Sequence, residues 1–280
     1  MSGLDAVGSP WRPVNRVALR RELDAGAEQT VTDIDDRAEF ERNKREKSIA
    51  LGRDPDLIDV GIHAMRASDK YDYAYLWSWM GVPIIQLPAD IIATQEIIWN
   101  TKPDIIIETG VARGGSVVFM ASMLELIGKG KVIGVDIDIR AHNRDSIERH
   151  PMAKRITLIE GSSIDPTVVK RVRDAIPEGS TVMVVLDSDH SHDHVLSELR
   201  HYGPLVTRGC YLIVSDTSLG YLSADQTPRN RSKVYLKGDE PLSALNSYLK
   251  ETGRFVVDPV VNGKLFLTSS LGGYLRCCGD

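Results

Sequence analysis

The strongest constraint in the sequence is an alternation of short apolar segments with helical segments from about residue 90 onward. Five segments rich in Ile, Val and Leu have the length and composition of buried strands, and two later segments are weaker candidates. The strands are expected at 104–108, 131–135, 156–159, 181–186, 210–214, 254–258 and 263–268. The helices are expected at 90–100, 116–127, 166–175, 192–202 and 241–251. This order predicts an α/β fold with a doubly wound, mostly parallel, seven-stranded Rossmann-like sheet.

Composition limits the classes of partner. The 280 residues carry 34 Lys+Arg against 39 Asp+Glu, a net charge of −5, which argues against nucleic acid or an anionic membrane as the main partner. No apolar run approaches the roughly 18 residues of a membrane span, and the N-terminus lacks the apolar core of a signal peptide. The 3 cysteines, two of them adjacent at Cys277 and Cys278, do not form a disulfide framework. We therefore expect a cytoplasmic protein that acts on a small molecule.

The N-terminal part of the chain differs from the rest. Residues 1–70 are expected to form a charged helical extension, and residues 71–280 the functional domain. The charge-dense segment 20–47 is either a solvated helical arm or a segment that packs on a partner subunit or covers a site, so a homo-oligomer is one possibility. The aromatic segment 71–92, broken by glycine and proline, is either core or the wall of a pocket.

The first strand runs into Glu108-Thr-Gly-Val-Ala-Arg-Gly-Gly-Ser116, a glycine-rich turn before a helix. Its G-x-x-x-G-G spacing is neither the dinucleotide motif nor the phosphate loop. It suits S-adenosylmethionine, because a carboxylate before the glycines can meet the ammonium group of the ligand and the loop amides can meet its carboxylate. The expected contributors are Glu108, Gly110, Arg113, Gly114, Gly115 and Ser116.

The next two strand ends extend this interpretation. Asp136 ends the second strand, where a carboxylate can accept hydrogen bonds from ribose hydroxyls. Ser162 and Ser163 follow the third strand, where an adenine can meet hydroxyl and backbone groups. Taken singly, such a turn is often only structural, and an Asp at a strand end is often only a helix cap. Their order along the chain predicts an S-adenosylmethionine site, to which Asp187 at the fourth strand end also contributes.

The densest group of reactive side chains is Asp187-Ser-Asp-His-Ser-His-Asp-His194, after the fourth strand. Asp187 and Asp216 lie at the ends of neighbouring strands and can share one divalent cation, for which oxygen ligands favour Mg²⁺. His190 is then expected to be the base that deprotonates a hydroxyl, because imidazole titrates near neutral pH. Two alternatives remain: the histidines lie on an exposed helical turn, or His190, His192 and His194 hold zinc or iron.

Four motifs resemble the family named after cephalosporin hydroxylase, also known as rhamnosyl O-methyltransferase, over about residues 60–275. They are Trp79-Met-Gly-Val-Pro-Ile-Ile-Gln-Leu-Pro-Ala-Asp90, the glycine-rich turn, Leu186-Asp-Ser-Asp-His-Ser-His-Asp-His194 and Val214-Ser-Asp-Thr217. The resemblance implies the fold of class I S-adenosylmethionine-dependent methyltransferases and, in the cephamycin-pathway member, magnesium-dependent O-methylation.

A more distant resemblance to catechol O-methyltransferase implies roles for single residues. It makes Asp187 and Asp216 metal ligands, puts Thr217 where that enzyme has an Asn ligand, and puts His190 where it has its base. Ser215 stands where the cephamycin-pathway protein has a Glu ligand, and that protein's first ligand aligns with Ser188 or Asp189. Asp189 is therefore a further candidate ligand.

The sequence thus predicts an S-adenosylmethionine-dependent O-methyltransferase, assisted by a divalent metal, that acts on a hydroxyl of a sugar or of a glycosylated natural product or polysaccharide precursor. The alternatives are an iron-dependent hydroxylase, as the family name suggests, and a non-catalytic subunit of the same fold. The acceptor pocket is expected to draw on 71–88, 269–278 or 218–235, where Arg229, Arg231 and Lys233 can meet an anionic acceptor.

Overall fold

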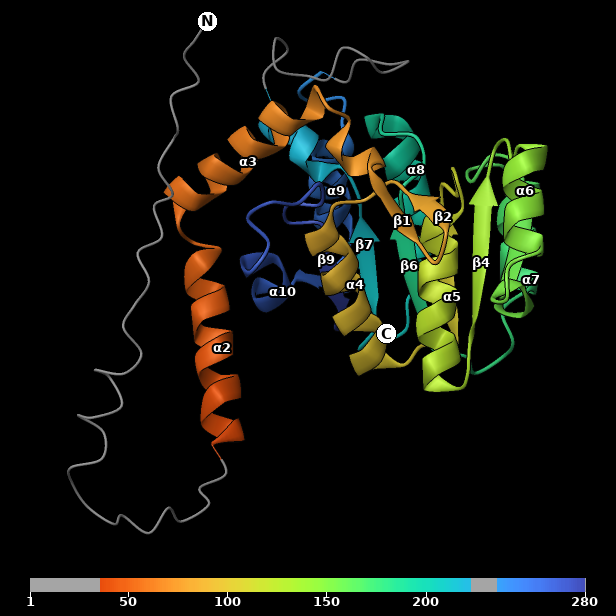
Figure 1. Ribbon diagram of the computed structural model, residues 1–280, viewed down its shortest axis with the longest axis horizontal. Helices are drawn as coiled ribbons and strands as arrows, with labels where there is room; N and C mark the ends of the chain where they lie inside the picture. The colour runs from red at the N-terminus through yellow and green to blue at the C-terminus, as the bar shows by residue number, and fades with distance from the viewer. Residues whose placement is uncertain (1–35, 223–235, 280) are drawn as a thin grey trace, which may run out of the picture. The chain divides into compact units, whose positions relative to one another are not determined.

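The computed structural model of the protein describes residues 36–222 and 236–279 (Figure 1). The chain divides into two units after Arg42, and the sheet and its helices belong to the second. Arg229, Arg231 and Lys233, which the sequence offers for an anionic acceptor, lie outside the described residues. Within the described part of the chain, no helix has both the length and the apolar character that crossing a bilayer requires.

The described chain begins with two helices, α2 (Arg37–Leu51) and α3 (Pro55–Asp69). The Asp54 carboxylate caps α3 by accepting from the backbone N–H groups of Asp56 and Leu57, and Pro55 takes the first helical position. The expected helical extension is therefore confirmed for this part of the chain. A short 3₁₀ helix, η1 (Tyr73–Tyr75), and a hairpin of β1 (Trp77–Trp79) and β2 (Val82–Ile84) follow.

The predicted seven-stranded sheet is present, in the order β5-β4-β3-β6-β7-β9-β8. Neighbours from β5 to β7 pair in parallel, whereas β9 is antiparallel to both β7 and β8. The strands are β3 (Ile105–Thr109), β4 (Lys131–Asp136), β5 (Ile156–Glu160), β6 (Val182–Leu186), β7 (Tyr211–Val214), β8 (Phe255–Val257) and β9 (Tyr274–Cys277). The first six strand predictions along the chain are confirmed within a few residues.

The strand predicted at 263–268 is wrong. The Asp258 carboxylate accepts from the N–H groups of Val260 and Val261 and starts a short helix, α10 (Pro259–Gly263), instead. The chain then runs without regular structure until β9, the seventh strand, at Tyr274–Cys277. The backbone of this segment passes close to α3: a Cβ atom at Gly61 would lie 1.7 Å from the carbonyl oxygen of Phe266.

Helices cover both faces of the sheet (Figure 1). On one face, α4 (Pro88–Thr101) and α5 (Gly115–Ile127) pack residues such as Ile98 and Phe119 against Ile106 of β3. On the other face, residues such as Val172 and Leu199 pack against Ile107. The helices of this second layer are α7 (Pro166–Asp174), α8 (His192–Tyr202) and α9 (Pro241–Glu251). The helix α6 (Ala141–Glu148) was not predicted, because most of its residues are polar and exposed.

The carboxyl ends of the parallel strands lie in one row. From β3 the chain passes to β4 and β5 on one side and returns to β6 and β7 on the other, so the loops after β3 and β6 diverge at a topological switch point. Backbone hydrogen bonds keep these loops in register: the N–H of Asp187 donates to Thr109 at 2.9 Å, and the N–H of Ser215 donates to Leu186 at 2.9 Å. The strand ends named from the sequence therefore meet along one edge of the sheet.

Candidate functional site

A cavity of about 1190 Å³ opens at this row of strand ends. It is larger than the roughly 300–1,000 Å³ of an ordinary ligand pocket, so it has room for a cofactor and an acceptor together. Tyr73, Tyr75 and Leu87 line one side, and Ser269 and Ser270 contribute as well, which confirms that 71–88 and 269–278 form part of the wall. Of the segment 218–235, Ser218, Leu219 and Leu222 line the cavity, and residues 223–235 lie outside the described chain.

The glycine-rich turn forms one end of this cavity, and all six of its predicted contributors line it. Gly110 and Gly114 have φ angles of 90° and 91°, which only glycine adopts freely. Gly115 packs against the β2 backbone, since a Cβ atom there would lie 2.3 Å from the Pro83 carbonyl oxygen. The helix α5 begins at Gly115 without a side-chain cap. Its first N–H groups are suited to an anionic group such as a carboxylate.

Glu108 is the buried carboxyl group of this site. It is 0 % exposed, and its Oε2 atom accepts from the Ser116 hydroxyl at 2.9 Å. Its Oε1 atom is buried without a hydrogen-bond partner in the described structure. Burial, and secondarily the charge of Asp136, raises the pKa of Glu108 to about 8, against the lowering effect of Ser116. A bound cation would satisfy both the unpartnered oxygen and the buried charge, so the site fits the ammonium group of S-adenosylmethionine.

Asp136 also lines the cavity, but it has a structural task that the sequence did not suggest. Its Oδ2 atom accepts from the N–H groups of Val111 and Ala112 at 2.8 and 3.0 Å, and its Oδ1 atom accepts from that of Asp138 at 3.0 Å. Asp136 therefore fixes the glycine-rich turn, in which Ala112 has a φ of 46°. Each carboxylate oxygen can accept more than one hydrogen bond, so Oδ1 can still serve a ribose hydroxyl.

Ser162 and Ser163, after β5, both line the cavity. The hydroxyl of Ser163 lies 3.0 Å from Nε2 of His194, and its carbonyl accepts from the Tyr202 hydroxyl at 2.7 Å. Ser162 and Ser163 thus follow β5, the strand beside the one that ends in Asp136, and their contact with adenine stays a prediction.

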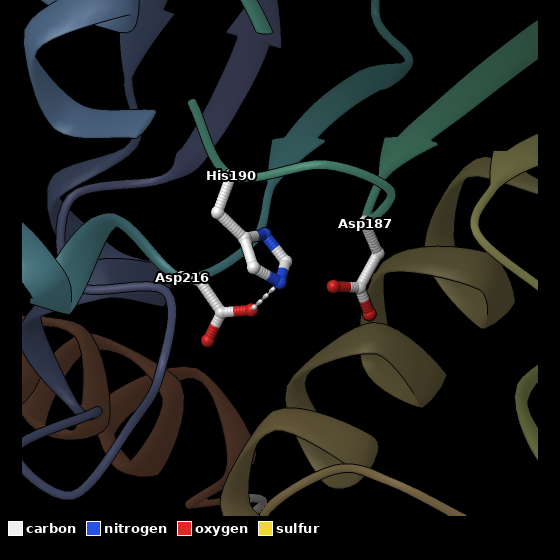
Figure 2. Close-up of side chains that lie close together, drawn as sticks. All are labelled: Asp187, His190 and Asp216. Atoms are coloured by element: carbon white, nitrogen blue, oxygen red, sulfur yellow. Dashed lines mark ion pairs between the residues drawn. The ribbon is translucent and has the colours of Figure 1, made fainter. Parts of the chain in front are cut away.

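Asp187, His190 and Asp216 form the cluster that Figure 2 shows. One potential ligand atom from each lies within 4.8 Å of the others, and His190 Nε2 lies 3.2 Å from Asp216 Oδ2. No other group of three or more His, Cys, Asp or Glu residues within residues 36–222 and 236–279 has such an arrangement. Two carboxylates and an imidazole make a fitting set of donors for a divalent cation.

The electrostatics of the cluster also favour a bound cation. Burial raises the pKa of Asp187 well above its ordinary value, and the negative charges of Asp216, Glu108, Asp90 and Glu198 raise it further. Ionised carboxyl groups this close together repel each other, and a cation among them would relieve the repulsion. The donor set and the charge therefore fit both a divalent metal and a cationic ligand.

Asp90, in the first turn of α4, is a cavity residue that sequence reasoning did not select. It is 4 % exposed and accepts from the Tyr274 hydroxyl at 2.9 Å, from the Ser269 N–H at 3.0 Å and from the Thr268 hydroxyl. Burial raises its pKa despite these donors. The only signal in the sequence was its place at the end of the motif 79–90.

Two of the four predicted metal ligands, Thr217 and Asp189, are not members of the cluster. Thr217 is 0 % exposed, donates its hydroxyl to the Leu271 carbonyl at 2.9 Å and does not line the cavity. Asp189 lines the cavity but accepts from the N–H and hydroxyl of Ser191, at 2.9 and 2.5 Å, and is not part of the cluster. The third member of the cluster, beside Asp187 and Asp216, is therefore His190 and not Thr217.

The alternative site of three histidines is wrong for the described structure. His192 contacts Asp193 at 2.9 Å and Ser247 at 3.4 Å, whereas Nε2 of His194 lies near Ser163 and Ser188. Because α8 begins at His192, the three rings do not share one face, and no His-only metal group forms among the described residues.

The chain matches a protein-family model, "Rhamnosyl O-methyltransferase/CmcI", over residues 71–278. The chain belongs to this family. A rhamnosyl O-methyltransferase of Mycobacterium leprae (strain TN) is 31% identical over 207 residues, which cover 72% of this chain and 84% of that protein. A rhamnosyl O-methyltransferase of Mycobacterium tuberculosis (strain ATCC 25618 / H37Rv) is 33% identical over 149 residues, 51% of this chain and 57% of that protein. The family and the enzyme class predicted from the motifs, an O-methyltransferase, are confirmed.

Solved structures of CmcI share the fold of this rhamnosyl O-methyltransferase/CmcI family member. An apo-structure of CmcI superimposes with a TM-score of 0.52 at 20% identity and covers 74% of this chain and 78% of that one. A CmcI structure with Mg and S-adenosylmethionine gives 0.51 at 20% identity, with 73% and 78% covered. The predicted Rossmann-like methyltransferase fold is therefore confirmed.

Part of the cavity wall lies outside the region matched by the rhamnosyl O-methyltransferase/CmcI family. Met65, Arg66, Ser68, Asp69 and Lys70, at the end of α3, line the cavity and precede residue 71, where the family match begins. Earlier in the same helix, Gly61 lies against the backbone of Phe266.

Proposed function

We propose that the protein transfers a methyl group from S-adenosylmethionine to a hydroxyl of a sugar, or of a glycosylated natural product or polysaccharide precursor, with the help of a divalent cation. The observation that carries the proposal is one cavity that joins a buried, half-partnered Glu108 to the cluster of Asp187, His190 and Asp216. The names of the mycobacterial relatives support a sugar acceptor, and the CmcI structure with Mg and S-adenosylmethionine supports both small molecules.

Different residues of this chain would bind the different groups of S-adenosylmethionine. Glu108 would receive the ammonium group, and the N-terminus of α5 would receive the carboxylate. Asp136 would accept from the ribose through Oδ1, and Ser162 and Ser163 would meet the adenine. Arg113, exposed on the turn, adds positive charge beside the N-terminus of α5.

Asp187 and Asp216 are the residues proposed to hold the cation, and their oxygen atoms favour Mg²⁺. When bound, S-adenosylmethionine supplies an electrophilic methyl group, and a divalent cation supplies positive charge that favours ionisation of a nearby hydroxyl. The chain itself would hold the reactants close together in one cavity.

His190 is proposed to accept the proton of the acceptor hydroxyl. The oxygen then forms its bond to the methyl carbon while the bond from that carbon to sulfur breaks, and the sulfur keeps the electron pair. The charges balance, because the proton gained by His190 replaces the positive charge lost at sulfur. Asp216 lies 3.2 Å from Nε2 of His190 and stabilises the imidazolium that forms.

The acceptor would enter between the strand ends and the wall formed by α3 and η1. Tyr73 and Tyr75 offer aromatic surfaces there, and Asp90 also lines the cavity. The three cysteines Cys210, Cys277 and Cys278 are free thiols, which supports the proposal of a reducing compartment such as the cytoplasm.

An iron-dependent hydroxylase is less well supported by the donor set. Oxygenases of that type use two histidines and one carboxylate, whereas this cluster has one histidine and two carboxylates. Their chemistry also gives no reason for the unpartnered oxygen of Glu108.

Calorimetric titration with S-adenosylmethionine, with and without Mg²⁺, tests the proposal, followed by turnover with methyl rhamnoside as acceptor. We expect micromolar binding and formation of S-adenosylhomocysteine together with a methylated sugar. Turnover that depends instead on ferrous iron and dioxygen would favour the hydroxylase. Absence of binding under both conditions would favour the non-catalytic subunit.

A further inference from the structure

A line of polar side chains runs from the interior of α8 to the wall of the cavity. The Glu198 side chain is 1% exposed, and its Oε1 atom accepts from the Ser188 hydroxyl at 2.7 Å. The same Ser188 oxygen lies 3.2 Å from Nε2 of His194, and this nitrogen lies 3.0 Å from the Ser163 hydroxyl. Ser163, Ser188 and His194 all line the cavity. The line therefore joins the loops after β5 and β6 at the surface that a ligand would touch.

Glu198 fixes the direction of every hydrogen bond along this line. A hydroxyl has a single proton, and Ser188 donates its own to Glu198. The Ser188 oxygen then faces His194 with its lone pairs, and Nε2 of His194 also lies 3.6 Å from the Glu198 carboxylate. An unprotonated Nε2 would repel both neighbours, so Nε2 carries a proton and donates it.

Ser163 is the last member of the line. Because Nε2 of His194 is the donor, the Ser163 oxygen accepts from it, and the proton of the Ser163 hydroxyl remains available. The position of Ser163 is fixed, since its carbonyl accepts from the Tyr202 hydroxyl and the residue is 5% exposed. Ser163 therefore has a hydroxyl proton to donate into the cavity, because one of its lone pairs already accepts from His194.

The burial of the Glu198 carboxylate lowers the stability of the fold, and packing does not explain why a carboxylate occupies this position. Its Oε2 atom has no hydrogen-bond partner among the described residues, and an unsatisfied buried carboxylate oxygen destabilises the fold. An apolar residue at this place in α8 would avoid the cost. The carboxylate is needed, however, if the line of hydrogen bonds must point toward the cavity.

We propose that Glu198 is a positioning residue for cofactor recognition: through Ser188 and His194 it sets Ser163 as a hydrogen-bond donor to a ring nitrogen of adenine. This inference rests on the proposed function, since it takes S-adenosylmethionine and its product as the ligands. A site built to donate discriminates against a ligand that lacks the matching acceptor, because its donor is left unpaired.

Calorimetric titration with S-adenosylhomocysteine and three analogues tests the proposal, and it needs no turnover. In each analogue one ring nitrogen, N1, N3 or N7, is replaced by C–H. We expect one analogue to bind the wild-type protein roughly tenfold more weakly than the parent, as for the loss of one hydrogen bond. In Ser163→Ala the parent and that analogue should bind alike.

Three further variants separate positioning from general stability. Glu198→Leu and Ser188→Ala should each reduce the selectivity to less than about threefold, because Ser163 is no longer held as a donor. Glu198→Gln should retain it, since the amide oxygen can accept from Ser188. Ser122→Ala is the matched control: Ser122 is a buried, hydrogen-bonded serine of α5 that does not line the cavity, and its variant should keep full selectivity.

The outcomes are distinct. Selectivity that survives in both Glu198→Leu and Ser188→Ala overturns the proposal, as does equal binding of all analogues to the wild type. A wild-type protein that does not bind S-adenosylhomocysteine at all overturns the proposed function together with this inference. If Glu198→Leu does not fold, Ser188→Ala decides, because it cuts the same line without removing a charge.

Discussion

Gly110 and Asp187 meet backbone to backbone at the switch point of the sheet. A Cβ atom at Gly110 would lie 1.8 Å from the carbonyl oxygen of Asp187, and Gly110 has a φ of 90°. The two loops that carry the cofactor and metal residues can therefore approach this closely only with glycine at position 110. A side chain here would separate Glu108 from the cluster at the end of β6.

Gly110→Ala should destabilise the protein and weaken S-adenosylmethionine binding, and Gly128→Ala is the matched control. Gly128 has a φ of 87°, but a Cβ atom there would meet nothing within 4 Å, so its variant bears only the backbone strain of about 1–2 kcal/mol. Gly110→Ala adds a clash with backbone, and urea unfolding should show a clearly larger loss. Equal stability of the two variants, with unchanged affinity, would contradict the close approach.

Glu108 should make the stability of the ligand-free protein fall as the pH rises. Its pKa is about 8 in the fold against an ordinary 4.5, so between these values the folded chain binds more protons than the unfolded chain. The contribution of Glu108 to folding stability is therefore fully present below pH 4.5 and is lost as the pH rises through 8. Each unit of pKa shift corresponds to about 1.4 kcal/mol of unfolding free energy. Because the amide of Glu108→Gln cannot ionise, the free energy of unfolding of this variant should exceed that of the wild type by several kcal/mol at pH 8.5.

Denaturant unfolding at pH 5.5, 7 and 8.5 measures this gap between wild type and Glu108→Gln. The same variant should bind S-adenosylmethionine more weakly, because an amide does not attract an ammonium group. A gap that stays constant across the three pH values would show that Glu108 is not buried as a neutral acid.

Asp187→Asn should raise the melting temperature of the metal-free protein and remove its response to Mg²⁺. The carboxyl group is buried beside Asp216, Glu108 and Asp90, so an uncharged amide relieves repulsion. Asp193→Asn is the control on α8, because the Asp193 side chain is 100% exposed. Thermal melts with and without Mg²⁺ compare the variants; a Mg²⁺-induced shift that persists in Asp187→Asn would remove Asp187 from the metal site.

The sheet and the row of strand ends were accessible from sequence for a physical reason. Buried parallel strands need unbroken β-branched runs such as 105–107, and parallel strands bring their carboxyl ends to one edge, so Asp187 and Asp216 had to be neighbours. The strand β9 escaped prediction because it is short and follows Gly272 and Gly273.

Contacts between distant segments were not accessible in the same way. Asp90 receives its donors from Thr268, Ser269 and Tyr274, almost two hundred residues later, and no local pattern announces this. The direction of the Thr217 hydroxyl depends on where the Leu271 carbonyl lies, and this position is set by tertiary packing rather than by local sequence.

Thr217→Val should reduce stability without removing the effect of Mg²⁺. The hydroxyl is buried and donates to the Leu271 carbonyl, so the substitution leaves that carbonyl unpaired at a cost of about 1–3 kcal/mol. Urea unfolding measures the loss, and thermal melts with Mg²⁺ measure the response to metal. If a folded Thr217→Val protein no longer responds to Mg²⁺, Thr217 is a ligand after all.

His190→Ala should lower turnover by about 10²- to 10⁴-fold, the range for loss of a positioned general base, while S-adenosylmethionine affinity stays within about twofold of wild type. The His190 ring contacts Asp216, which is not among the residues proposed to bind S-adenosylmethionine, so the proposed cofactor contacts remain. Mg²⁺ affinity separates the two roles that the cluster allows. If His190 is the base, Mg²⁺ affinity should persist in His190→Ala, because two oxygen ligands remain; a loss of Mg²⁺ affinity in step with turnover would identify His190 as a metal ligand instead.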